Sequence, residues 1–223
     1  MKRQAAAAIF DMDGLLVDSE PLWRRAEQAV FPKVGLRLTD RMCMQTMGTR
    51  VDEVVRHWYC VQPWAGPSPA EVADEIVQTV ISLVRAEGAL MPGAVQALEF
   101  FAARAVPAAL ASSSSPRLID AVVDTLEIRR YFRLLVSAED EPLGKPHPGV
   151  FLRTAAALHA DPGGCIVFED SFAGMIAGLA ARMRVVVVPD RLHFDDPRFG
   201  AAHLKLRSLA EFDAQRLEQL LRS

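Results

Sequence analysis

The stretch Ala5–Glu20, AAAAIFDMDGLLVDSE, contains a short apolar run that ends in two aspartates one residue apart. A run of this length, closed by a polar cluster, predicts a buried β-strand over Ala5–Phe10. Side chains two residues apart in an extended chain point the same way, so Asp11 and Asp13 are expected to face one cleft. Gly14 lets the chain turn close beside them. Two acids suit a nucleophile with an acid/base partner, whereas a helix cap needs only one.

From residue 94 onward, segments typical of helices and of strands alternate along the chain. This alternation predicts an α/β fold, a Rossmann-like parallel sheet covered by helices on both faces. We expect helices over Ala94–Arg104, Pro116–Leu126, Pro148–Leu158, Phe172–Ala181 and Leu209–Leu221, and strands over Val106–Ala111, Leu134–Ser137, Cys165–Phe168 and Arg184–Val188. Ligands of such sheets bind beyond the carboxyl ends of the strands, where the sequence has Asp11, Ser112, Glu169 and Asp170.

Residues 18–88 have the pattern of an inserted all-helical cap domain. The first helix is predicted from an apolar stripe made up of Leu22, Ala26, Ala29 and Val30, with a polar face that contains Arg24, Arg25, Glu27 and Gln28. Ser19 is its expected N-cap, and further helices are expected over Thr39–Met47, Val51–Trp58 and Pro69–Ala86. Residues 1–17 and 89–223 then form the catalytic core, joined to the cap by hinges near Leu15–Asp18 and Glu87–Met91.

The bulk composition favours a small ligand over a nucleic acid or a membrane as the main partner. The 223 residues are 51% hydrophobic, carry a formal net charge of −3 and contain no dense lysine and arginine cluster. The apolar stretch before Asp11 is too short for a secretion signal, and no run approaches the ~20 residues of a membrane-spanning helix. We therefore expect a cytoplasmic protein, and a monomer.

The three cysteines have no paired spacing. Cys43, Cys60 and Cys165 are interpreted as small buried side chains of a reduced protein. A zinc site at His57 and Cys60 is disfavoured because no second pair of ligands supports it.

Two motifs in the second half of the chain suit an anionic ligand. The first is a serine cluster, Ser112–Ser115, between a predicted strand and a predicted helix, where hydroxyl groups and free N–H groups can bind phosphate oxygens. Within it, Ser115 is interpreted as the helix cap. The second motif is GKPHP, in which two prolines fix the backbone around Lys145. A lone lysine is usually a solvated surface charge, but here it is held where it can offset phosphate.

The apolar strand CIVF ends in a second pair of acids, Glu169 and Asp170. Consecutive acids usually mark a solvated helix start. Here the sheet rule brings them together with Asp11 and Asp13, and four carboxylates beside an anion need compensating cations. Lys145 alone is insufficient, and hard oxygen ligands that leave room for water point to Mg²⁺, with Mn²⁺ or Co²⁺ as substitutes.

These four motifs, in this order, resemble those of the haloacid dehalogenase superfamily in its phosphatase form. The cap stretch HWYCVQPWAGPS, from His57 to Ser68, resembles bacterial 2-deoxyglucose-6-phosphate and hexitol-phosphate phosphatases. The resemblance implies that Asp11 is the nucleophile and that Asp13 is the acid/base. It also implies substrate binding by Ser112, Ser113 and Lys145, and metal binding by Asp11, by the Asp13 carbonyl, by Asp170 and by a nearby Glu169. The expected reaction is hydrolysis of small sugar phosphates through an aspartyl-phosphate.

Substrate choice is expected to come from the cap. Arg50 matches a cap arginine of related sugar-phosphate enzymes, although a surface charge fits its position equally well. Trp23, Trp58 and Trp64 can stack on a sugar or fill the cap core, and for Trp58 we expect the core.

Three alternative functions remain open. A dehalogenase does not need Asp13, and a binding protein does not need the full set of acids and Lys145. A β-phosphoglucomutase-like isomerase shares all four motifs, but its cap histidine is replaced here by Trp23, whose indole cannot accept a proton. We therefore expect Asp13 to remain able to activate water, which favours hydrolysis.

Overall fold

The computed structural model describes residues 5–222, and within them one parallel sheet has the strand order β3-β2-β1-β4-β5-β6. The strands are β1 (Ala7–Phe10), β2 (Ala108–Ser112), β3 (Phe132–Ser137), β4 (Cys165–Glu169), β5 (Arg184–Val187) and β6 (Leu204–Lys205). The direction of strand addition reverses between β1 and β4, so the carboxyl ends of these two strands border the crevice where ligands of such sheets bind. The predicted Rossmann-like α/β core is confirmed.

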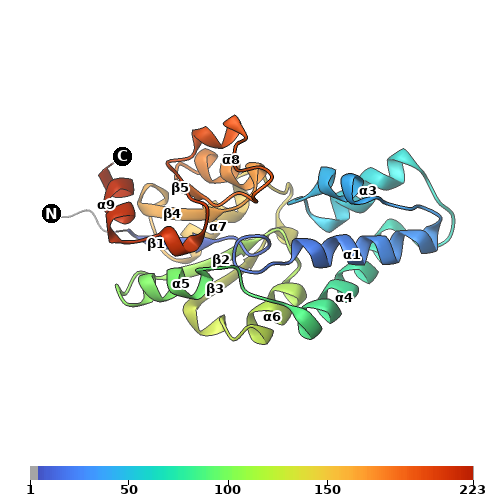
Figure 1. Cartoon of the computed structure of the whole chain (residues 1–223), viewed down its shortest axis with the longest axis horizontal. Coiled ribbons are helices and arrows are strands. Elements are labelled where there is room, and N and C mark those ends of the chain that lie inside the picture. The colour runs from blue at the N-terminus through green and yellow to red at the C-terminus, as the bar shows by residue number, and fades with distance from the viewer. Residues whose placement is uncertain (1–4, 223) are drawn as a thin grey trace.

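The sheet is buried on both faces because successive residues of its central strand enter different hydrophobic clusters. Ala8 and Phe10 pack with helices α5 (Ala94–Ala102) and α6 (Pro116–Thr125). Ala7 and Ile9 pack with α7 (Gly149–Ala157) and α8 (Phe172–Ala180), which lie on the opposite side of the sheet (Figure 1). A strand buried on both faces has an unbroken apolar run, which is the pattern that AAIF shows.

The segment between β1 and α5 is helical and lies beyond one end of the sheet (Figure 1). It contains α1 (Glu20–Val30), α2 (Asp40–Cys43), α3 (Val51–Val61) and α4 (Pro69–Glu87), with short 3₁₀ turns between them. Helix α4 packs against α1 and α3 and also against α6 of the sheet region. The two connecting segments are paired, since the Asp18 N–H donates to Ala89 O at 2.9 Å and the Met91 N–H donates to Leu16 O at 2.9 Å.

Helix α1 follows its predicted stripe with two differences. Leu22, Ala26 and Val30 are buried, but Ala29 is exposed. Glu27, which the pattern places on the polar face, is buried with only 7% of its surface exposed. Part of the polar face of α1 is therefore turned toward the interior of the molecule.

Other differences come from short or interrupted elements. Strand β6 was not predicted because two residues carry no readable alternation. The predicted helix Leu209–Leu221 is a 3₁₀ turn (Leu209–Glu211) followed by α9 (Ala214–Arg222), because buried Phe212 is extended between them. The predicted helix Thr39–Met47 is the short α2 followed by the 3₁₀ turn Met44–Thr46.

The cysteines and Trp58 can be compared directly with their predicted burial. Trp58 is buried in the helical segment, so its interpretation as core is confirmed. Cys43 and Cys165 are buried, but Cys60 is exposed, so that prediction was wrong for Cys60. No helix within residues 5–222 has the length and apolar character needed to span a membrane.

Candidate active site

The centre of the site is an ion-paired lysine at the carboxyl ends of β1 and β4. The Lys145 ammonium lies 2.6 Å from Asp11 Oδ1 and 2.5 Å from Glu169 Oε1, and it donates to Ala111 O at 3.3 Å. Burial alone would lower the pKa of Lys145, but the two carboxylates raise it above its usual range. Lys145 is therefore a buried, charged group and not the solvated surface charge that a lone lysine usually is.

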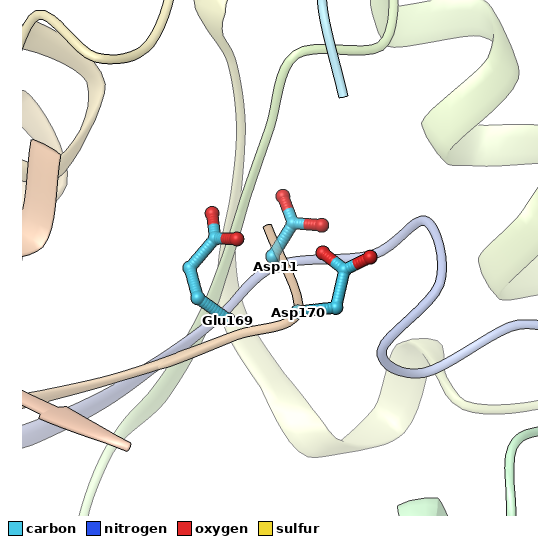
Figure 2. Close-up of side chains that lie close together, drawn as sticks. All are labelled: Asp11, Glu169 and Asp170. Atoms are coloured by element: carbon cyan, nitrogen blue, oxygen red, sulfur yellow. The ribbon is translucent and has the colours of Figure 1, made fainter. Parts of the chain in front are cut away.

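Asp170 completes a cluster of three carboxyl groups with Asp11 and Glu169 (Figure 2). One oxygen from each lies within 4.8 Å of the others. Burial raises the pKa of Asp11 and of Asp170, and the mutual repulsion of the neighbouring carboxylates adds to the effect. Three carboxylates beside one ammonium leave two formal negative charges, so this all-oxygen donor set fits a hard divalent cation.

Two glycines make room for these acids. A Cβ on Gly14, which has a φ of +75°, would lie 2.3 Å from Asp170 Oδ2. A Cβ on Gly174, in the first turn of α8, would lie 1.9 Å from Glu169 Cδ. Neither position can accept a side chain unless the acid cluster moves.

We expect Gly174→Ala to lower the free energy of unfolding by about 1–3 kcal/mol, because Glu169 is fixed by Lys145 and Ser171 and cannot withdraw. Urea unfolding monitored by circular dichroism measures the change. Gly200→Ala is the control, since a Cβ there meets nothing within 4 Å and should change stability by less than about 0.5 kcal/mol. Equal stability of the two variants would contradict the crowding inferred around Glu169.

Asp13 is held by donors from both sides of the site. Its Oδ1 accepts from Ser19 Oγ at 2.6 Å and from Trp23 Nε1 at 3.0 Å. Its Oδ2 accepts from Ser114 Oγ at 2.7 Å and from Ser112 Oγ at 3.4 Å. The sequence analysis missed Ser114 in this role. Ser19 precedes α1 as predicted, but its side chain bonds to Asp13 and makes no cap hydrogen bond.

The serine cluster follows β2 as predicted. Ser112 and Ser113 line the same cavity as Asp11, Asp13, Lys145 and Asp170. Ser112 Oγ also accepts from the Ser114 N–H at 3.0 Å, which fixes the turn. Ser115 stands at the N-cap of α6, as interpreted, but its hydroxyl makes no cap bond.

The helical segment between β1 and α5 also lines the cavity. One face of α1 contributes Glu20, Trp23, Arg24 and Glu27, and the segment around α2 contributes Cys43, Thr46, Gly48 and Thr49. Of these, the sequence analysis singled out Trp23 alone as a pocket residue. The spacing of the α1 residues, three or four apart, is the signal that would have shown their common face.

Arg50 does not line this cavity. Its guanidinium lies 2.8 Å from Asp52 and donates to Glu141 O at 2.8 Å and to Ala138 O at 3.2 Å. It thus connects the start of α3 to the loop after β3, and its donors are engaged away from the acid cluster. Recognition of substrate by Arg50 remains a prediction without support from this geometry.

The protein-family model of the haloacid dehalogenase-like hydrolases matches residues 5–182. The chain belongs to the haloacid dehalogenase-like hydrolases. Hexitol phosphatase B of Escherichia coli (strain K12) is 46% identical over 216 residues, which cover 96% of this chain and 97% of that protein. A phosphorylated carbohydrates phosphatase of Thermotoga maritima is 29% identical, with 78% and 81% of the two chains covered. The predicted superfamily and the prediction of an enzyme are confirmed.

Solved structures of this superfamily share the fold. A β-phosphoglucomutase of Clostridium difficile superposes with a TM-score of 0.84 over 98% of each chain, at 23% identity. A haloacid dehalogenase family hydrolase of Deinococcus radiodurans gives a TM-score of 0.71 over 98% of each chain, at 26% identity. The first of these likenesses concerns architecture alone, so the reaction has to be argued from the site residues.

Proposed function

We propose that this haloacid dehalogenase-like hydrolase is a phosphatase that hydrolyses small phosphorylated sugars, including hexitol phosphates and hexose 6-phosphates such as 2-deoxyglucose 6-phosphate. The observation that carries the proposal is a single cavity that is lined by Asp11, Asp13, Lys145 and Asp170 and also by residues of α1. The 46% identity with hexitol phosphatase B over nearly the whole chain supports the substrate class.

In the proposed reaction Asp11 attacks phosphorus in line, so that a bond from its carboxylate oxygen to phosphorus forms while the bond to the substrate oxygen breaks. Asp13 gives a proton to the departing alkoxide. It then takes a proton from water, whose oxygen displaces Asp11 and releases inorganic phosphate. The donors on Asp13 from Ser19, Trp23 and Ser114 support this role because they fix its carboxylate beside the nucleophile.

The cofactor in this proposal is Mg²⁺, held by the carboxylates of Asp11 and Asp170 and by the backbone carbonyl of Asp13, with Glu169 nearby. The ion would supply positive charge to offset the phosphoryl oxygens. Glu169 accepts from both Lys145 and Ser171, so we assign it the role of positioning Lys145 against Asp11. The phosphate is bound by Lys145, by the Ser112 hydroxyl and by the Ser113 N–H.

Residues 18–88 are proposed to act as the cap that selects the sugar, and residues 1–17 and 89–223 as the catalytic core. The two chain segments that connect these parts are hydrogen-bonded to each other at Asp18 and Met91, which supports a hinge there. Trp23 and Ser19 are cap residues that donate to the acid/base Asp13. The indole N–H of Trp23 can orient Asp13 but cannot take up a proton, so Asp13 remains available to water, as hydrolysis requires.

The deciding experiment compares products from two kinds of reaction. With sorbitol 6-phosphate and 2-deoxyglucose 6-phosphate we expect one inorganic phosphate for each substrate consumed. With β-glucose 1-phosphate and a glucose 1,6-bisphosphate primer we expect free phosphate and little glucose 6-phosphate. Predominant glucose 6-phosphate would replace the phosphatase proposal with the β-phosphoglucomutase-like isomerase.

A further inference from the structure

Glu27 is a buried carboxylate in the wall of the substrate cavity. Only 7% of the surface of Glu27 is exposed, and its Oε2 has no hydrogen-bond partner within residues 5–222. A buried acceptor without a partner costs about 1–3 kcal/mol of stability, and more when it is charged. A hydroxyl group that donated to this oxygen would remove that cost.

The surroundings of Glu27 supply little compensation. The Cys43 thiol and Arg24 favour the charged form of the carboxyl group. Burial nevertheless raises the pKa of Glu27 to about 7. Glu27 and Cys43 both line the cavity, so the buried carboxyl group lies at its wall.

The position of Glu27 along α1 relates it to the reaction centre. Glu20, Trp23 and Glu27 share one helix face, and Trp23 Nε1 touches the acid/base Asp13. Glu27 lies one turn farther along, about 6 Å beyond Trp23 measured on the helix axis. A longer polyol chain that starts at Asp13 extends farther along this face toward Glu27 than a three-carbon chain does.

We propose that Glu27 Oε2 accepts a hydrogen bond from a hydroxyl at the end of the substrate remote from the phosphate, so that α1 selects extended polyol phosphates by length. This inference rests on the proposed phosphatase function. It makes Glu27 a specificity-determining residue. It also explains why an acidic side chain from the polar face of α1 is turned inward and left with a free acceptor.

The test measures kcat/KM on glycerol 3-phosphate, erythritol 4-phosphate, ribitol 5-phosphate and sorbitol 6-phosphate. For Glu27→Met, which keeps the length of the side chain but has no oxygen acceptor, we expect a loss of roughly 10- to 100-fold on sorbitol 6-phosphate. The loss should appear mainly in KM and should be absent on glycerol 3-phosphate. Glu27→Gln, which keeps one acceptor oxygen, should lose less.

Two controls separate recognition from a structural role. Gln28→Met changes the next residue of α1, whose side chain bonds to Asp40 outside the cavity. This variant should keep the wild-type ratio of kcat/KM between sorbitol 6-phosphate and glycerol 3-phosphate. Thermal unfolding of Glu27→Met should occur at or above the wild-type temperature, because an unpaired buried carboxylate is removed.

The outcomes distinguish the two proposals. A wild-type protein that hydrolyses none of the four substrates overturns the proposed substrate class and the role of Glu27 with it. Equal hydrolysis of all four by the wild type overturns the role of Glu27 alone. A wild-type preference for sorbitol 6-phosphate that survives in Glu27→Met overturns the role of Glu27 alone. Equal losses on all four substrates with a lowered unfolding temperature also overturn it, because they identify Glu27 as a structural partner of Cys43.

Discussion

Replacing Asp11 with asparagine is expected to lower kcat on sugar phosphates by on the order of 10⁴-fold or more while the fold is kept. The amide has the shape of the carboxyl group but cannot attack phosphorus. Chelation by EDTA is expected to abolish activity in the wild-type protein, because two of the negative charges of the acid cluster are not offset by Lys145. Adding Mg²⁺ in excess of the EDTA should then restore the activity of the wild-type protein.

The stability of the same variant provides the control. Burial raises the pKa of Asp11 above that of an unfolded chain, so ionised Asp11 destabilises the folded protein at neutral pH when no cation is bound. Asparagine removes this cost, and Asp11→Asn in EDTA should unfold at a temperature no lower than the wild type. Near-normal phosphate release by the variant, or full wild-type activity in EDTA, would contradict the assignment of Asp11.

The parallel sheet was predictable because its first five strands along the chain each contain an apolar run of readable length and are followed by a helical pattern. Asp11, Ser112, Glu169 and Asp170 were predictable for the same reason, since the topology fixes where strand ends meet. Lys145 was predicted instead from the GKPHP motif. Ser114 was harder to assign, because four consecutive serines offer equivalent hydroxyls and the turn decides which one reaches Asp13. Strand β6 was missed because its two residues are defined only by pairing with β5.

The helical segment between β1 and α5 was less predictable than the sheet because its residues both pack together and line the cavity. The periodicity of α1 predicted that Glu27 is exposed to solvent. In the structure Glu27 is buried, and the polar residues on this side of α1 line the cavity. Arg50 was singled out because it matches a cap arginine of related sugar-phosphate enzymes. Nothing in the sequence shows that Asp52 and two distant carbonyl groups take up its donors. Long-range contacts of this kind carry no local sequence signal.

The second large effect is expected at Asp13. Asp13→Asn should lower kcat on sorbitol 6-phosphate by roughly 10²- to 10⁴-fold, because the alkoxide leaves unprotonated and water is no longer deprotonated. The asparagine can still accept from Ser19 and Trp23, and its amide can donate to the Ser114 hydroxyl, so the site keeps its geometry. Loss of activity would then reflect lost proton transfer rather than a displaced cap.

A substrate with a good leaving group separates the two proton transfers. With p-nitrophenyl phosphate the first step needs no acid, whereas the second still needs a base to activate water. Rapid-quench kinetics of Asp13→Asn should therefore show a burst of about one nitrophenol per active site followed by slow turnover, and sorbitol 6-phosphate should give no burst. Asp11→Asn is the matched control and should show no burst with either substrate. If Asp13→Asn turned over both substrates steadily at wild-type rates, Asp13 could not be the group that carries the proton in either step.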